Sequence, residues 1–161
     1  LPDFEDYSMK GRTYRYFSGR PLYEFGYGLS YTSFRYDNLK LPVRIATNEA
    51  VEVSVDVTNA GRMDGDEVVQ VYISHEGLSF DTPIRSLKGF RRVSLKKGET
   101  KTVRFLLESD DLAVTTEEGH IVVMPCTVKI AVGGKQPDAV SLKRNAVVEK
   151  NIELVGNPVN L

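Results

Sequence analysis

The segment from Val51 to Val57 alternates strictly between valine and a polar residue. Because successive side chains of a β-strand point to opposite faces, this pattern puts the valines on one face and Glu52, Ser54 and Asp56 on the other. An amphipathic helix would instead repeat its apolar residues every three or four positions. The pattern therefore predicts a strand with one buried face and one exposed face.

Further short strands are expected on both sides of this segment, separated by turn residues. The expected strands are 31–41, 51–57, 68–73, 87–95, 100–107, 121–124, 127–132 and 139–154, the last one broken near Arg144 and Asn145. Strand 68–73 is apolar on both faces and is expected to be central. Ser109 is expected to cap a single helical turn at 109–112.

These short strands occur without any long helical pattern, which is typical of sandwiches. The sequence predicts an all-β fold, an antiparallel immunoglobulin-like β-sandwich of about seven strands with an irregular N-terminal arm. Its core is expected to form from strands centred on Val55, Val71, Phe105 and Ile130. The expected division is an arm at 1–29 and a sandwich at 30–161.

The arm is set apart by its aromatic residues. The chain has 8 Tyr and 7 Phe, and 11 of these 15 fall within the first 36 residues. The arm has neither a helical period nor a clean strand alternation. So much apolar surface needs cover, and Gly26 and Gly28 are expected to adopt positive φ angles beside the rings.

Three interpretations of the arm remain open. It could dock onto another protein domain, since Tyr, Phe and Arg are typical of interfaces. The candidate docking residues are Arg12, Tyr14, Arg15, Tyr16, Phe17, Phe25, Tyr27 and Tyr31. It could fold back onto its own sandwich, so full burial of Tyr14, Tyr16, Phe17 and Phe25 within one chain would argue against docking. It could also bind oligosaccharides, with Tyr14, Tyr16, Tyr23 and Tyr27 stacking on sugar rings.

Composition argues against several classes of function. The net charge of −1 does not provide the basic face that nucleic-acid binding needs. No run of about 18 apolar residues occurs, so no membrane span is expected, and the opening residues 1–6 do not have the pattern of a signal peptide. Cys126 is the only cysteine, which excludes an internal disulfide and a cysteine-based metal cluster.

The sequence offers no convincing catalytic, cofactor or metal site. His75 is expected in a loop and His120 at a turn, both solvated and without metal-ligand spacing. The acidic residues between Asp64 and Glu67 could hold calcium weakly, but a turn that leads into a strand is the better interpretation. Gly26-Tyr27-Gly28 precedes a strand rather than a helix, so it is not a dinucleotide-binding loop.

Several motifs together resemble the C-terminal fibronectin type III-like domain of glycoside hydrolase family 3 enzymes of the β-glucosidase and β-xylosidase type. They lie at 11–17 (GRTYRYF), 21–34 (PLYEFGYGLSYTSF), 53–61 (VSVDVTNAG), 65–72 (GDEVVQVY), 83–93 (PIRSLKGFRRV) and 98–103 (GETKTV). Two positions depart from the family pattern. Glu24 stands where proline is common, and Cys126 where glycine is common.

The resemblance implies that this chain is an accessory domain rather than an enzyme. Family 3 enzymes are retaining exo-glycosidases that remove terminal β-linked sugars. Their aspartate nucleophile lies in an upstream barrel domain, and their acid/base glutamate usually lies in the α/β domain that follows it. Neither domain is in this sequence, so no catalytic residue and no cofactor can be assigned. The implied partners are those upstream catalytic domains, and the implied compartment is periplasmic or extracellular.

Overall fold

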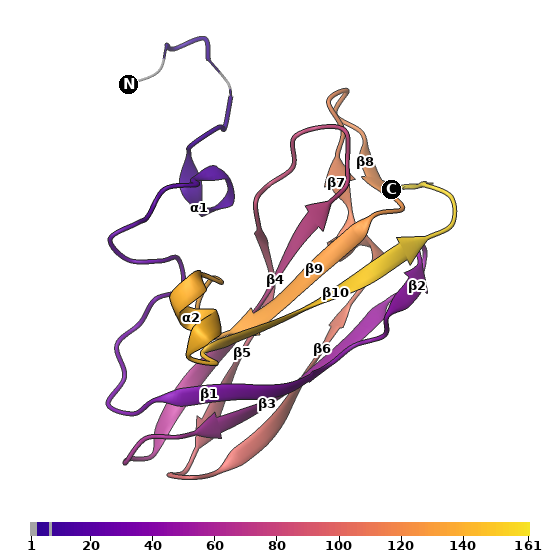
Figure 1. Ribbon diagram of the computed structural model, residues 1–161. Helices are drawn as coiled ribbons and strands as arrows, with labels where there is room; N and C mark the ends of the chain where they lie inside the picture. Colours follow the sequence, from indigo (N-terminus) through magenta and orange to yellow (C-terminus); the bar gives the residue numbers. More distant parts are fainter. Residues whose placement is uncertain (1–2, 7) are drawn as a thin grey trace.

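The computed structural model describes residues 3–6 and 8–161. The described chain is mostly β-structure, with two short α-helices and one 3-10 turn (Figure 1). The strands are β1 (Phe34–Lys40), β2 (Arg44–Ala46), β3 (Val51–Asn59), β4 (Gly65–Glu76), β5 (Ser86–Leu95), β6 (Thr100–Leu107), β7 (Val114–Thr115), β8 (Ile121–Val123), β9 (Thr127–Gly133), β10 (Val147–Val155) and β11 (Val159–Asn160). The helices are α1 (Thr13–Tyr16) and α2 (Ala139–Lys143), and the 3-10 turn is η1 (Ser109–Leu112).

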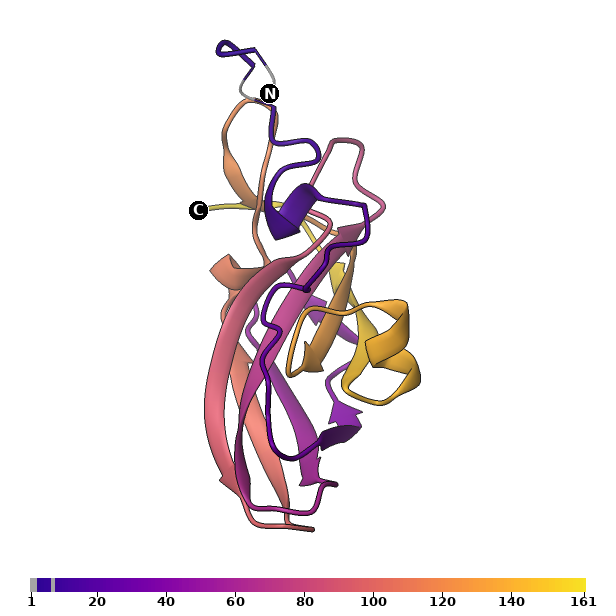
Figure 2. The same ribbon diagram turned by 90° about the vertical axis from the view of Figure 1, so that its left-hand side faces the viewer.

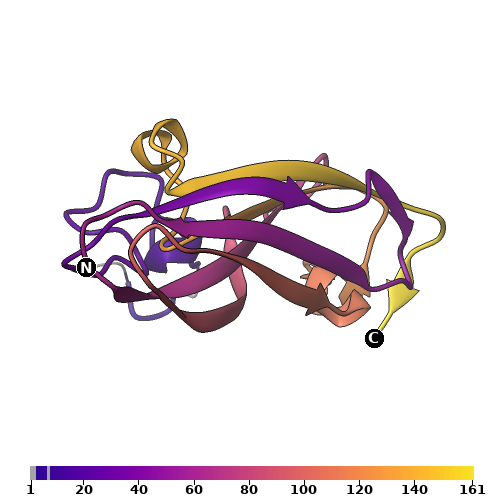
Figure 3. The ribbon, with the colours of Figure 1, turned by 90° about the horizontal axis from the view of Figure 1, so that it is seen from below.

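Two sheets form the layers of a sandwich (Figure 3). One sheet has the strand order β1-β3-β6, and the other has the order β2-β10-β9-β4-β5. A small third sheet, β11-β8-β7, lies at one end of the molecule. All pairings are antiparallel except that of β2 with β10, which is parallel. The predicted all-β sandwich is therefore confirmed.

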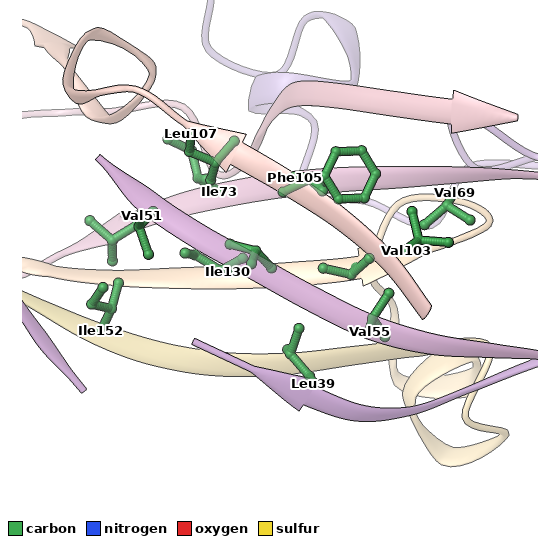
Figure 4. Packing of buried hydrophobic residues seen from close by; sticks show 14 of the residues in the cluster. Leu39, Val51, Val55, Val69, Ile73, Val103, Phe105, Leu107, Ile130 and Ile152 are labelled. Carbon is green, nitrogen blue, oxygen red and sulfur yellow. The ribbon is translucent and has the colours of Figure 1, made fainter. Parts of the chain in front are cut away.

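The core lies between the two large sheets. The valines at 51, 53, 55 and 57 are completely buried, as their alternation predicts. They pack in one cluster with Val71 of β4, Ile130 of β9 and Phe105 of β6 (Figure 4). The four strands expected to supply the core all contribute to it, so the hydrophobic pattern alone was sufficient to locate it.

Most strand boundaries agree with the sequence, with two notable differences. β1 begins at Phe34 rather than Tyr31, and Tyr31 lies in a bend with its side chain exposed. β4 runs from Gly65 to Glu76 and is longer than expected, because it stays paired with β9 as far as Glu76. β4 pairs on both sides, with β5 and β9, and so is central as predicted.

The largest error concerns the segment 139–154, which is only partly a strand. Its first part is the helix α2, and β10 begins at Val147. Asp138 starts the helix because its carboxylate accepts hydrogen bonds from the backbone N–H groups of Val140 and Ser141. The hydroxyl of Ser141 in turn accepts a bond from the Asp138 N–H, which completes a capping box.

Smaller corrections concern elements of a few residues. Glu108, not Ser109, is the N-cap of η1, and its N–H donates to Oδ2 of Asp111 at 3.1 Å. The strands β2, β7 and β11 have two or three residues each and were not expected. Segments this short carry too few side chains to show a periodic pattern.

The N-terminal arm lies on the outer face of the five-stranded sheet. It is irregular as expected, except that α1 forms a single helical turn. Figure 2 shows it running over β4 and β5 from α1 toward β1, with α2 beside it. No helix in the described part of the chain is long and apolar enough to cross a membrane.

Candidate docking surface

Tyr14 holds the arm against the sandwich. Its ring stacks on Phe25, with centroids 4.1 Å apart and an interplanar angle of 11°. It also meets the edge of Tyr72 on the outer face of β4, at 6.4 Å between centroids. Its hydroxyl oxygen accepts a hydrogen bond from the Leu87 N–H at 3.1 Å. Aromatic stacking, edge-to-face packing and a hydrogen bond thus fix this side chain together.

Two backbone hydrogen bonds attach the same part of the arm to loops of the sandwich. The N–H of Ile84, in the loop between β4 and β5, donates to the carbonyl of Arg15 at 2.7 Å. The N–H of Gln136, in the loop after β9, donates to the carbonyl of Phe25 at 3.0 Å. The part of the arm from α1 to Phe25 is therefore a layer on the sandwich rather than a free tail.

Gly26 allows the arm to approach β4 closely. Its φ angle is +80°, and a Cβ atom at this position would lie 2.3 Å from Oε1 of Gln70. Gln70 is buried, and its Nε2 donates to the carbonyl of Gly134 at 2.8 Å, while Tyr72 donates its hydroxyl to the amide oxygen. A Cβ atom on Gly28 would meet nothing within 4 Å, and Gly28 has no positive φ angle. The prediction of positive φ is correct for Gly26 and wrong for Gly28.

Lys135 joins the arm to the cap of α2. Its ammonium group lies 3.2 Å from a carboxylate oxygen of Glu24 and 3.0 Å from one of Asp138. Burial alone would lower the pKa of Lys135, but the two carboxylates outweigh it and the pKa is raised. Glu24, where the resembling family commonly has proline, therefore has a local role in this chain.

The residues that follow the arm are fixed between the end of β3 and the start of β4. The hydroxyl of Thr32 donates to Oδ1 of the buried Asn59 at 2.6 Å. Gly61 and Gly65 leave room for Thr32, since a Cβ on either glycine would lie within 2.7 Å of it. The N-terminal segment up to Thr32 is thus attached at three places, near Tyr72 and near Gln70 on β4 and at Asn59 of β3.

Several large apolar or aromatic side chains between residues 22 and 31 are exposed to solvent. Leu22, Leu29 and Tyr31 are 90%, 91% and 95% exposed, and Tyr23 and Tyr27 form an exposed pair with centroids 5.2 Å apart. We call these five residues the arm patch. Leu22 and Leu29 were not among the candidate docking residues. Their position between aromatic residues is the sequence feature that could have identified them.

The candidate docking residues divide into two groups. Phe17, Phe25, Tyr27 and Tyr31 are exposed, and so is Arg15, whose carbonyl is bonded to the sandwich. The partly buried members are Arg12, Tyr14 and Tyr16. Since Tyr14, Tyr16, Phe17 and Phe25 are not all buried, the observation that would have argued against docking does not occur. Arg12 pairs locally with Asp6 at 3.3 Å.

The acidic cluster at 64–67 is dispersed among separate partners. Oδ1 of Asp64 accepts from the Lys97 N–H, and Asp66 forms an ion pair with Arg92. Glu67 turns inward, where burial raises its pKa, and Tyr36 donates its hydroxyl to it at 2.7 Å. Among residues 3–6 and 8–161, no three His, Cys, Asp or Glu side chains are grouped so that they could hold a metal ion. These acidic residues lie where a turn leads into β4, as expected.

The expectation for His75 was wrong, and that for His120 is correct. His75 belongs to β4, is partly buried, and has its Nε2 2.9 Å from the carbonyl oxygen of Leu112. Burial lowers the pKa of His75, and the charge of Lys88 adds to this effect, while the bond to Leu112 opposes it. His120 is exposed beside a turn.

Comparison with known proteins places this arrangement in a family. The model of the fibronectin type III-like domain matches residues 67–136. A β-xylosidase of Formosa agariphila is 47% identical over 133 residues, which are 82% of this chain and 18% of that protein. A periplasmic β-glucosidase of Salmonella typhimurium is 36% identical over 124 residues, which are 75% of this chain and 16% of that protein.

A solved structure agrees with these matches. β-Glucosidase 3B from Thermotoga neapolitana, in complex with α-D-glucose, has a TM-score of 0.77 and 31% identity, and covers 92% of this chain. The chain is a fibronectin type III-like domain of glycoside hydrolase family 3. This fibronectin type III-like domain spans less than a fifth of the length of each of these three relatives. The resemblance seen in the sequence motifs is thereby confirmed.

Proposed function

We propose that this fibronectin type III-like domain is the non-catalytic accessory domain of a longer exo-β-glycosidase acting on β-glucosides or β-xylosides. In this proposal residues 1–29 connect the sandwich to upstream catalytic domains, and the arm docks onto them and stabilises them. The supporting observation is the arm patch. It is exposed in this chain, although the backbone beneath it is fixed on the sandwich at Tyr14, Gly26 and Thr32.

Physical chemistry supports docking as the role of the arm patch. The five residues of the arm patch all fall within residues 22–31, which is a higher density than the single exposed apolar residues normal on a protein surface. Tyr and Phe are enriched at the centres of interfaces. An arm already ordered on its own domain loses little further conformational entropy when a partner covers it. The two named enzymes that match this chain are several times longer, so each has ample chain to supply such a partner.

The main alternative is direct binding of oligosaccharide. Tyr14 is packed against Tyr72 and Phe25, so it is not free to act as a stacking platform. Tyr23 and Tyr27 remain accessible, but their planes are tilted by 37°. Calorimetric titration with xylo- and cello-oligosaccharides at millimolar concentration decides between the two. We expect no heat of binding, and saturable heat would favour the sugar-binding alternative.

The docking proposal is tested in the full-length parent enzyme. We expect the double substitution Leu29→Ser and Tyr31→Ser to lower the thermal midpoint of the parent, while the isolated 161-residue chain carrying it melts unchanged. The matched control is Val43→Ser, an exposed apolar residue on the loop between β1 and β2. Equal melting of the wild-type and doubly substituted parent would contradict docking. Hydrolysis of a nitrophenyl β-xyloside or β-glucoside by the isolated chain would contradict its non-catalytic role.

A further inference from the structure

A cavity lies between the arm and the loop after β9. Its volume is about 330 Å³, large enough for one small ring system but not for an oligosaccharide. Four of its eight lining residues are aromatic. The lining residues are Gly11, Thr13, Tyr14, Phe17, Pro21, Tyr23, Phe25 and Gln136. We call it the Gln136 cavity.

The Gln136 side chain is the feature of this cavity that packing alone does not explain. Gln136 is only 6% exposed, and its backbone is fixed by the hydrogen bond to Phe25. Its amide oxygen Oε1 is buried without a hydrogen-bond donor among the residues that the structure describes. Buried acceptors without a donor are uncommon in native proteins. Gln136 lines the cavity, so turning its amide toward the cavity would let a molecule held there supply the missing donor.

The shape and chemistry of the cavity favour an aromatic occupant with a single N–H donor. Carboxylates bring only acceptors. Sugars carry many hydroxyls, and ammonium or guanidinium groups carry three to five donors, most of which an aromatic wall would leave unpaired. An indole has a large apolar face for stacking and exactly one donor, Nε1–H, with no acceptor. The terminal torsion of a glutamine is soft, so a small rotation can direct Oε1 toward that donor.

We propose that the Gln136 cavity receives the indole of a tryptophan presented by the upstream part of the parent chain. This inference rests on the proposed docking function and names the side chain that anchors it. The fibronectin type III-like domain itself contains no tryptophan, so the ring comes from another segment. More than four-fifths of the length of the matched β-xylosidase lies outside the aligned region. Tryptophan is also a residue that often contributes most of the binding energy of an interface.

The test compares indole with 1-methylindole, which keeps the rings and lacks the N–H. Each is titrated into the isotopically labelled 161-residue chain, and the side-chain NH₂ and backbone N–H signals of Gln136 are followed by NMR. We expect saturable shifts with indole and an affinity for 1-methylindole that is weaker by about threefold to tenfold, the value of one hydrogen bond. Because the chain contains no tryptophan, the fluorescence of the added indole gives an independent measure of binding.

Two variants separate the hydrogen bond from the apolar contact. Gln136→Met has similar length and no acceptor, so it should bind both probes with equal affinity and remain folded. Phe17→Leu should weaken the binding of both probes by the same factor, because it removes an aromatic ring from the cavity wall and leaves the Gln136 amide in place. Equal affinity of the wild-type chain for the two probes, or no shift at Gln136 with either, would overturn the proposal. Shifts at Gln136 with xylose or glucose would overturn it in favour of a sugar site.

A measurement in the full-length parent distinguishes this inference from the docking proposal itself. If both are right, Gln136→Met lowers the thermal midpoint of the parent, as the arm-patch substitutions do. If Gln136→Met leaves the midpoint unchanged while Leu29→Ser with Tyr31→Ser lowers it, the tryptophan anchor is wrong and docking stands. If neither changes the midpoint, both proposals fail.

Discussion

At the scale of single residues, Gly26 decides how closely the arm lies on the sheet. The positive φ angle of this residue is unfavourable for any side chain, and Gln70 below it is held by Tyr72 and Gly134. We expect Gly26→Ala to destabilise arm packing by about 1–2 kcal/mol, mostly through backbone strain. Hydrogen exchange at the Gln136 and Leu87 N–H groups, which donate to the arm, should become correspondingly faster.

Gly28→Ala is the matched control for this prediction. Gly28 is two residues away in the same arm, has an ordinary φ angle, and has open space where a Cβ atom would lie. The Gly28 variant should leave exchange at Leu87 and Gln136 unchanged or slightly slower, because alanine restricts the unfolded chain. Identical exchange in the two variants would show that the close approach to Gln70 is not what requires glycine.

His75 makes the stability of the domain depend on pH. The pKa of the unfolded residue is near 6.5, and burial lowers the pKa of the folded one. The unfolded state therefore binds more protons just below that pH, so the free energy of unfolding falls as pH falls through this window. We expect His75→Gln to flatten this dependence between about pH 7.5 and about pH 5.5, as measured by urea denaturation.

Two comparisons control the pH experiment. His120→Gln changes an exposed histidine and should keep the wild-type slope. Glu67 acts in the opposite direction, since its raised pKa favours the folded state at low pH and that contribution is lost as pH rises. The difference between wild type and His75→Gln isolates the histidine from this background. An unchanged slope in the His75 variant would refute the assignment.

At the scale of elements, α2 depends on one side chain. Oδ1 of Asp138 accepts bonds from Val140 and Ser141 at 2.6 and 2.7 Å, and Oδ2 pairs with Lys135. We expect Asp138→Ala to cost about 1 kcal/mol in unfolding free energy through loss of the cap. Asp138→Asn keeps a capping oxygen and loses the charge, so it should cost clearly less. Equal losses in the two variants would assign the effect to the ion pair instead.

The regular strands were predictable because one face of each is buried. The alternation at 51–57 and 100–107 is imposed by the core, so the side chains themselves report both the element and its orientation. α2 was missed because five residues cannot display a helical period, although the Asp138 and Ser141 capping pair was visible. β2 was missed because its three residues are held by parallel pairing with β10, a contact distant in sequence.

At the scale of the whole molecule, the sandwich has a core that does not need the arm. Among the residues that the structure describes, none before Phe34 belongs to the main buried cluster. We expect a chain of residues 30–161 to fold, with an unfolding free energy lower by about 2 kcal/mol because Tyr72 loses its apolar cover. Urea denaturation measures the unfolding free energy, and the dispersion of the NMR signals shows whether the truncated chain folds. A truncated chain that does not fold would show that the arm is part of the folding unit.

Tyr14→Ala in the complete chain is the companion to that truncation. It should reproduce most of the decrease in unfolding free energy, since Tyr14 supplies the ring contact to Tyr72 and the hydrogen bond to Leu87. An arm substitution on the solvent side, such as Leu22→Ser, should leave stability unchanged within about 0.5 kcal/mol. If Leu22→Ser destabilised the chain as much as Tyr14→Ala, the arm would pack differently from the arrangement described.

The sequence indicated that the arm needed cover, but it did not divide the arm into a packed side and an exposed side. Tyr14 and Tyr31 belong to the same aromatic stretch, yet one stacks within the molecule and the other is almost fully exposed. The division depends on the outer face of β4, where Tyr72 and Gln70 meet the arm. A contact between segments so distant in the chain leaves no periodic signal in either of them.

The three places where the N-terminal segment is attached, two on β4 and one at Asn59 of β3, also bear on the response of the domain to mechanical force. Tension arriving from the N-terminal side meets the contact of Tyr14 with Tyr72 first, then that of Gly26 with Gln70, and then that of Thr32 with Asn59. We expect contacts loaded in this order to break one after another, as in peeling, instead of all sharing the load. The arm would then lengthen under tension while the sandwich beyond Phe34 stays folded, as an extensible tether does.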